Sequence, residues 1–94
     1  MSYKRVTIIS GSPVTDEMIA DMKNKWMPPS LGFGVTKWEA VQSGPDSVFI
    51  IATYPDKATA EAAADKAAAI RVEVQEEYSG PVPTILEGEV IVSN

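Results

Sequence analysis

Side chains that can hold a flat organic molecule are spread along this sequence. A ring can stack on the aromatic faces or the polarisable thioether of four residues, Trp26, Trp38, Met22 and Phe33. Groups able to orient a phenol or carbonyl oxygen are those of Asn24, Tyr54, Tyr78 and Arg71. Together these residue types predict a pocket for a small aromatic ligand. The alternative for each large apolar member is ordinary core, because such residues at helical spacing are usually buried.

The charged residues offer weaker signals for chemistry. Glu87 and Glu89 are two residues apart on a predicted strand and share a face, where paired carboxylates can split their pKa values or hold a hard cation. We expect instead the solvated charges of an edge strand, which guard against aggregation. Arg71 is likewise expected to pair on a helix surface with an acid such as Glu73 or Glu76.

The residue types that most often bind transition metals are missing. The sequence contains no cysteine and no histidine, which excludes disulfides and the usual zinc sites. Asp16, Glu17 and Asp21 suit the positive end of a helix rather than a metal cluster. We therefore expect no metal and no cofactor, and the sequence offers no convincing set of acid, base and nucleophile.

Length and charge limit the domain count and the partners. The 94 residues, 45% of them hydrophobic, suffice for one core, so we expect a single domain over residues 1–94. Thirteen acidic against eight basic residues give a net charge of −5, which repels phosphate backbones and anionic lipid headgroups. Nucleic acid and membranes are therefore poor partner candidates. Because no apolar stretch has the length of a signal peptide or membrane span, we expect a cytoplasmic location.

Runs of β-branched and aromatic residues predict four strands. They cover residues 3–10, 35–43, 47–54 and 84–92, with Gly88 as a candidate bulge in the last. The turn Gly44-Pro45-Asp46 between the middle two is short, so these strands are expected to form an antiparallel hairpin.

Apolar residues at helical spacing predict two helices. The first covers about residues 15–27, is capped by Thr15, and ends at Pro28-Pro29, before a loop over residues 30–34. Its apolar face is expected to hold Met18, Ile19, Met22 and Trp26. The second covers residues 57–78, between a cap at Asp56 and a stop at Gly80-Pro81. Its inward stripe is expected to be Ala63, Ala67, Ile70, Val74 and Tyr78.

The resulting order βαββαβ predicts an α+β, ferredoxin-like fold. Its four-stranded antiparallel sheet would carry both helices on one face. The third strand, however, is apolar on both faces, with Ile50 and Ala52 opposing Phe49 and Ile51. Because two helices cover only one face, the other is expected to pair with a second copy in a face-to-face homodimer. The alternatives are a strand phase shifted by one residue, or loops that cover the sheet edges.

The sequence resembles the dimeric α+β barrel superfamily and, within it, the antibiotic biosynthesis monooxygenase-like domains. The resemblance rests on Leu31-Gly32-Phe33, on the strand Val35–Val41 with its central Trp38, on the turn Gly44–Asp46, on Ile50–Tyr54, and on the helix opening Pro55–Ala62. It implies two sheets that close into a barrel across a homodimer. It also implies a pocket in each subunit between its helices and its own sheet.

Members of that superfamily differ in chemistry, so the resemblance leaves several functions open. They include haem-degrading enzymes, which rely on a histidine ligand, and the absence of histidine here disfavours that activity. Cofactor-independent monooxygenation of a quinol or polyaromatic phenol stays open, as does a non-catalytic ligand-binding or structural homodimer. An RNA-recognition module would need basic charge, and a copper chaperone would need cysteines. This sequence is acidic and has no cysteine, which disfavours both. An amino-acid-binding regulatory domain stays open.

Overall fold

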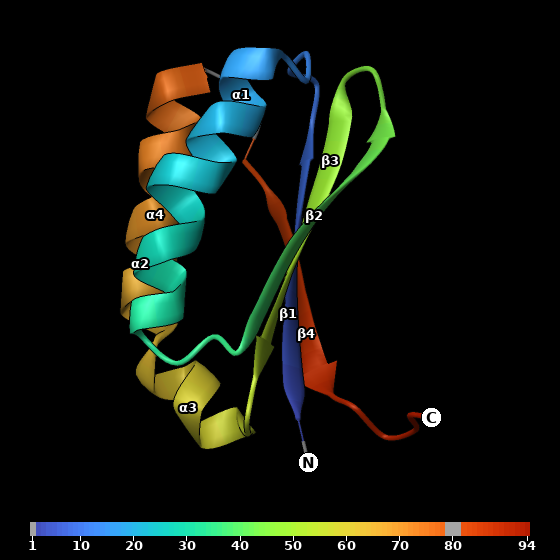
Figure 1. Cartoon of the computed structure of the whole chain (residues 1–94), viewed down its shortest axis with the longest axis vertical. Helices are drawn as coiled ribbons and strands as arrows, with labels where there is room; N and C mark the ends of the chain where they lie inside the picture. Colours follow the sequence, from blue (N-terminus) through green and yellow to red (C-terminus); the bar gives the residue numbers. More distant parts are fainter. Residues whose placement is uncertain (1, 79–81) are drawn as a thin grey trace.

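The computed structural model describes residues 2–78 and 82–94. A four-stranded antiparallel sheet lies beside a layer of helices, which cover one of its faces (Figure 1). The strands are β1 (Tyr3–Ser10), β2 (Lys37–Gly44), β3 (Ser47–Tyr54) and β4 (Thr84–Glu89), in the sheet order β2-β3-β1-β4. This is the ferredoxin-like α+β arrangement expected from the order βαββαβ.

Burial along β1 shows how the sheet directs its side chains. Tyr3, Arg5, Thr7 and Ile9 are buried under the helices, while the residues between them are only partly covered on the outer face. The register places Arg5 opposite Ala52 of β3 and Glu87 of β4. The predicted strand phase is therefore correct.

The first helical region runs further than predicted. It begins at α1 (Asp16–Asp21), where the Thr15 hydroxyl accepts a hydrogen bond from the Met18 amide at 3.1 Å, as expected of a cap. A wide π-helical turn, η1 (Met22–Trp26), and a last segment, α2 (Met27–Gly32), follow. Pro28-Pro29 was expected to end the helix, and that prediction is wrong.

The π turn explains why the two prolines are tolerated. They occupy the first positions of α2, directly after hydrogen bonds that reach five residues back, where a missing N–H costs little. The Ser30 hydroxyl donates to the Trp26 carbonyl at 2.9 Å and so satisfies one freed acceptor. Much of the predicted 30–34 loop is therefore helical. Ile19, expected on the buried face, is largely exposed.

The second helical region consists of α3 (Lys57–Ala62) and α4 (Ala64–Tyr78), which are separated at Ala63. The Asp56 carboxylate caps α3 by accepting from the Thr59 amide at 2.7 Å. The predicted inward stripe of α4 is confirmed, since Val74 is buried and Ile70 and Tyr78 pack against the core. The stop predicted at Gly80-Pro81 lies outside the described residues.

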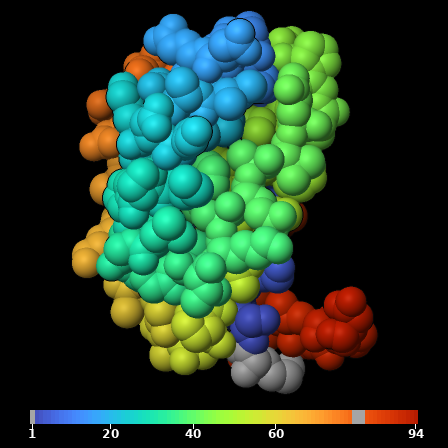
Figure 2. Space-filling view, in the orientation of Figure 1, coloured from blue at the N-terminus to red at the C-terminus, as the bar shows by residue number. Residues whose placement is uncertain are grey.

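The last strand is shorter and more regular than expected. Gly88 pairs with Lys4 in an unbroken register, so the predicted bulge is not formed. β4 ends at Glu89, after which the Val90 amide donates to the Ser2 carbonyl at 2.9 Å. The C-terminal segment then leaves the body of the molecule, as the red atoms in Figure 2 show.

Two clusters of buried side chains form the core between sheet and helices. One contains Met18, Met22, Trp26, Ile9, Val48 and Val74. The other contains Tyr3, Val35, Tyr54, Ala60 and Ala63. Trp38 packs against both clusters. Among the described residues, no helix is both long and apolar enough to cross a bilayer.

Candidate functional site

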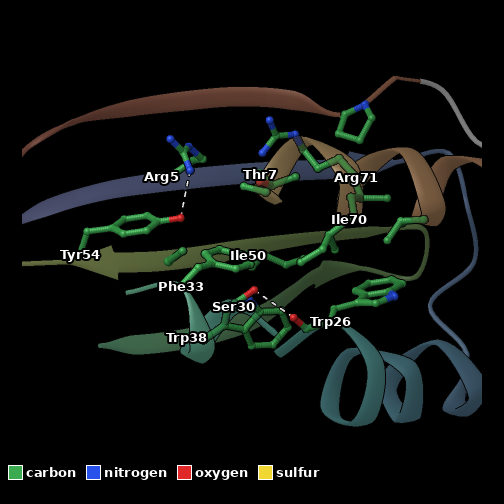
Figure 3. A pocket seen from close by; sticks show the side chains of 15 residues that line it. Arg5, Thr7, Trp26, Ser30, Phe33, Trp38, Ile50, Tyr54, Ile70 and Arg71 are labelled. Atoms are coloured by element: carbon green, nitrogen blue, oxygen red, sulfur yellow. Dashed lines mark hydrogen bonds between the residues drawn. The ribbon is translucent and has the colours of Figure 1, made fainter. Parts of the chain in front are cut away.

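A cavity of about 60 Å³ lies between the sheet and the helices, where the two core clusters meet. Its lining side chains come from every layer of the fold (Figure 3). They are Arg5, Thr7 and Ile9 of β1, Trp38 of β2, Ile50, Ala52 and Tyr54 of β3, Trp26, Ser30 and Phe33 of the first helical region, Ala67, Ile70, Arg71 and Val74 of α4, and Pro83. A pocket between helices and sheet was expected, and the structure has one there.

Five of the eight residues predicted to line a pocket do line this cavity. They are Trp26, Trp38, Phe33, Tyr54 and Arg71. Met22 is instead buried in the core, and Asn24 points to solvent from the π turn. Both lie in η1, where the wide turn directs only Trp26 toward the cavity.

Tyr78 stands behind the cavity wall rather than in it. Its ring meets Trp26 edge to face, with 5.9 Å between the ring centroids and 88° between the planes. Its hydroxyl donates to the Asp21 carboxylate, and burial raises the pKa of Tyr78 well above its usual range. Tyr78 therefore holds Trp26 in place.

Arg5, which was not among the predicted site residues, is the most buried charge at the site. Its Nε donates to Glu87 at 2.8 Å, one terminal nitrogen donates to the Tyr54 hydroxyl at 2.9 Å, and the other donates to the Ala60 carbonyl at 3.1 Å. The guanidinium also lies 5.3 Å from the centroid of the Tyr54 ring. The sequence feature that could have identified Arg5 is its position: it is a cation at an inward-facing position of the first strand, between Tyr3 and Thr7.

Glu87 belongs to this network, although it lies on the edge strand β4 and is exposed, as expected. Its pairing with Arg5 was not predicted. It faces the helices because it pairs with Arg5 across the sheet, and it also accepts a bond from the Tyr3 hydroxyl at 3.1 Å. The hydrogen bond from Arg5 is the main reason that the pKa of Glu87 lies below its usual range. Glu89, two residues on, is exposed as expected.

Arg71 reaches the cavity from α4, against the expectation that it pairs with a surface acid. It makes no hydrogen bond or ion pair with any other described residue. Burial, and then the positive charge of Arg5, lower the pKa of Arg71. Figure 3 shows its side chain on the same side of the cavity as Arg5 and Thr7.

Two hydroxyl groups complete the polar part of the lining. Tyr54 accepts a bond from Arg5, and burial raises the pKa of Tyr54, so its own proton stays available for donation. Thr7 is buried on β1 and its hydroxyl bonds to no other described side chain. The apolar and aromatic residues around these groups make the cavity mostly apolar.

A cluster of acids outside the cavity does not form an open cation site. Carboxylate oxygens of Glu17, Asp21 and Glu77 lie within 4.8 Å of one another. Lys25 already occupies this neighbourhood, with its Nζ 3.6 Å from Asp21 and 3.4 Å from Glu77. These bonds and charges raise the pKa of Lys25, so its ammonium supplies the positive charge there.

Solved structures share this fold, whereas neither a family model nor any curated protein matches the sequence. A protein of unknown function from Nitrosomonas europaea is 21% identical with a TM-score of 0.74, over 99% of this chain and 92% of that one. Rv0793 from Mycobacterium tuberculosis is 10% identical with a TM-score of 0.69, over 99% and 98%. An EthD family protein from Bacillus halodurans is 13% identical with a TM-score of 0.66, over 97% and 100%.

These likenesses concern the fold and not the activity. These proteins and this chain share a small antiparallel sheet with helices over nearly the whole chain. One fold carries many unrelated chemistries, so function has to be argued from the cavity itself.

Proposed function

We propose that this chain binds a small aromatic molecule in the cavity between its sheet and its helices. The observation that carries the proposal is the division of the lining into two sides. Trp26, Trp38 and Phe33 lie on the side of β2 and the first helical region, and Arg5 and Arg71 lie on the opposite side (Figure 3). A flat ring can stack on the first side while its oxygen substituents bond to the second.

The size of the cavity requires that its wall opens for a ring. A volume of about 60 Å³ holds only about four water molecules, and an apolar cavity that takes up benzene measures about 150 Å³. Trp38 and Phe33 are the wall members best placed to move. Both are only partly buried, Trp38 lies on the edge strand β2, and Phe33 follows the end of α2.

The catalytic form of this proposal is cofactor-independent oxygenation of a quinol or polyaromatic phenol. In this reaction a phenol and O₂ give a quinone and water: one oxygen atom replaces a ring hydrogen, and the other leaves as water. The substrate's phenolate supplies the electrons, so the protein needs to hold its oxygen and exclude water. Tyr54 and Arg5 suit the first task, and the aromatic wall suits the second. The resemblance to antibiotic biosynthesis monooxygenase-like domains supports this choice of reaction.

The test is oxygen uptake with a panel of hydroquinones and naphthols, run in air and without oxygen, with products identified by mass spectrometry. Removal of the stacking face in Trp38→Ala is expected to lower the rate by about tenfold or more, because the ring loses its position. Leu31→Ala, at an exposed site on α2, is the matched control and should leave the rate unchanged. Unchanged substrates in every incubation would remove the oxygenase from consideration.

A second candidate is a ligand-binding homodimer without turnover. It is favoured by the way Arg5, Glu87 and Tyr54 bond to one another, which leaves no free acid–base pair among the described cavity residues. A compound that raises the melting temperature but is recovered unchanged in air would select this function.

We also propose that a second copy covers the outer face of the sheet. Val6 and Ile8 of β1, Phe49 and Ile51 of β3, and Leu86 of β4 point away from the helices. Leu86 is 58% exposed and lies in a shallow groove of about 300 Å³ between β1 and β4. A contiguous apolar surface of this kind is typical of an interface, and the dimeric α+β barrel resemblance makes a second copy its occupant.

A further inference from the structure

Two guanidinium groups line one small, mostly apolar cavity, and only that of Arg5 forms an ion pair with a described carboxylate. Glu87 balances Arg5 at 2.8 Å. No carboxylate in the described residues lies within ion-pair distance of Arg71, and residues 1 and 79–81 include no acidic side chain. The cavity therefore carries one uncompensated positive charge, on a side chain that is only partly exposed.

The unused donors gather around that charge. Arg5 spends three of its N–H groups on Glu87, Tyr54 and Ala60, so its position is set by the protein. Arg71 spends none on a described residue, so within the described chain all five N–H groups of its planar fork are unused. The Tyr54 and Thr7 hydroxyls face the same cavity. All of these groups favour an acceptor with negative charge.

An uncompensated guanidinium near stacking aromatics defines a particular kind of ligand. A carboxylate presents two oxygens in the geometry of the guanidinium fork, so it can accept two parallel bonds, whereas a phenolate presents one. Partial burial weakens the competition from water and strengthens such a pair. The apolar side of the cavity would then hold the ring to which the carboxylate is attached.

We propose that Arg71 binds the carboxylate of an aromatic carboxylic acid, with Tyr54 donating a further hydrogen bond and Trp38 stacking on the ring. This assignment rests on the proposed function, because it names the class of small aromatic molecule that the cavity takes. It makes Arg71 the residue that separates acids from neutral rings of the same size.

The experiment is calorimetric titration of the full chain with benzoate, with benzamide of the same shape but no charge, and with hydroquinone. Wild-type protein is expected to bind benzoate at least about tenfold more tightly than benzamide, as a charge-assisted pair requires. Arg71→Gln should lose that preference while its affinity for benzamide stays the same. Arg71→Lys should keep only part of it, because the ammonium has no fork.

Lys66→Gln is the matched control, since it removes one exposed positive charge from the same helix without touching the cavity. A preference for benzoate that survives in Lys66→Gln and disappears in Arg71→Gln supports the assignment. Equal binding of benzoate and benzamide, or tighter binding of hydroquinone than of benzoate, overturns it and leaves the proposed aromatic site standing. Failure of all three probes to bind overturns the aromatic site and this inference together.

Discussion

Arg5 is a charged side chain in the core of a small domain, with an exposed fraction of only 5%. A buried guanidinium is costly unless it is paired and hydrogen-bonded. Glu87 supplies the pairing, and Tyr54 and Ala60 accept the remaining bonds. The pair also connects β4 to the cavity wall, so its first role is to hold Tyr54 and the sheet edge in position.

Loss of the charge on Glu87 should therefore destabilise the fold. Glu87→Gln leaves the Arg5 guanidinium without its counter-ion, and we expect the free energy of unfolding to fall by about 1 kcal/mol. The value is modest because the Glu87 side chain is 41% exposed and water screens the pair. Urea denaturation measures it. Glu89→Gln, on the same strand and face, is the control and should change stability by less than about 0.5 kcal/mol.

The same pair predicts how stability depends on acidity. The pKa of Glu87 in the folded chain is held below its ordinary 4.5 by the bond from Arg5. Its contribution to stability is therefore complete above 4.5 and is lost as the pH falls through the folded-state pKa. Urea titrations at descending pH should show a steeper loss for the wild type than for Glu87→Gln. Parallel curves for the two proteins would contradict this role.

The π turn η1 is the element that does most to shape the site. It ends at Trp26, which lines the cavity, and it lets α2 continue through two prolines to Ser30, whose hydroxyl bonds to the Trp26 carbonyl. π turns inside helices are often found at functional sites. Tyr78 of α4 then fixes Trp26 from the other side through edge-to-face packing.

The connection from α2 to β2 depends on a glycine at position 34. Its φ of 107° lies in a region that other residues rarely adopt, and an added Cβ would lie 2.5 Å from the Thr59 methyl carbon of the neighbouring helix. Gly34→Ala should therefore lower the free energy of unfolding by about 2 kcal/mol or more. Thermal or urea unfolding checks this.

Gly32 provides the matched control for that substitution. It lies at the end of α2 with an ordinary φ, and no atom lies within 4 Å of a Cβ added there. Gly32→Ala should leave stability unchanged or raise it by up to about 1 kcal/mol. Equal effects of the two substitutions would show that neither the conformation nor the contact at Gly34 matters.

At the scale of the whole molecule, the sheet has two apolar faces and the helices cover one. The covered face holds the cavity, and the outer face holds the proposed contact with a second copy. Leu86 on β4 tests this separation because it is exposed on the outer face and does not line the cavity.

Light scattering after size exclusion should give a mass of about twice 10.1 kDa for the wild type. Leu86→Asp is expected to reduce it to that of one chain, because a charge at a paired apolar face is not solvated. Val72→Asp, at a 53% exposed site on α4, is the control and should keep the mass of the wild type. A wild-type mass of 10.1 kDa at micromolar concentration would contradict the dimer.

Local sequence patterns determined the order of elements, the caps at Thr15 and Asp56, and the faces of the strands, because each depends on near neighbours along the chain. They also predicted that Trp26 and Trp38 line a cavity. The prediction that the first helix ends at Pro28-Pro29 was wrong, because the π turn before these prolines does not follow from the regular spacing of apolar residues in a helix.

Only the tertiary structure decided which polar groups meet in the cavity. Arg5 and Glu87 are 82 positions apart, and their pairing follows from the register of β1 against β4. Arg71 looked like a surface charge because its helix is rich in acids, yet the packing of α4 on the sheet directs it into the cavity. Long-range register and helix rotation are set by the packing of the whole domain. For that reason the aromatic residues and Arg71 could be named from the sequence as candidates, while the place of Arg5 and Glu87 beside them could not.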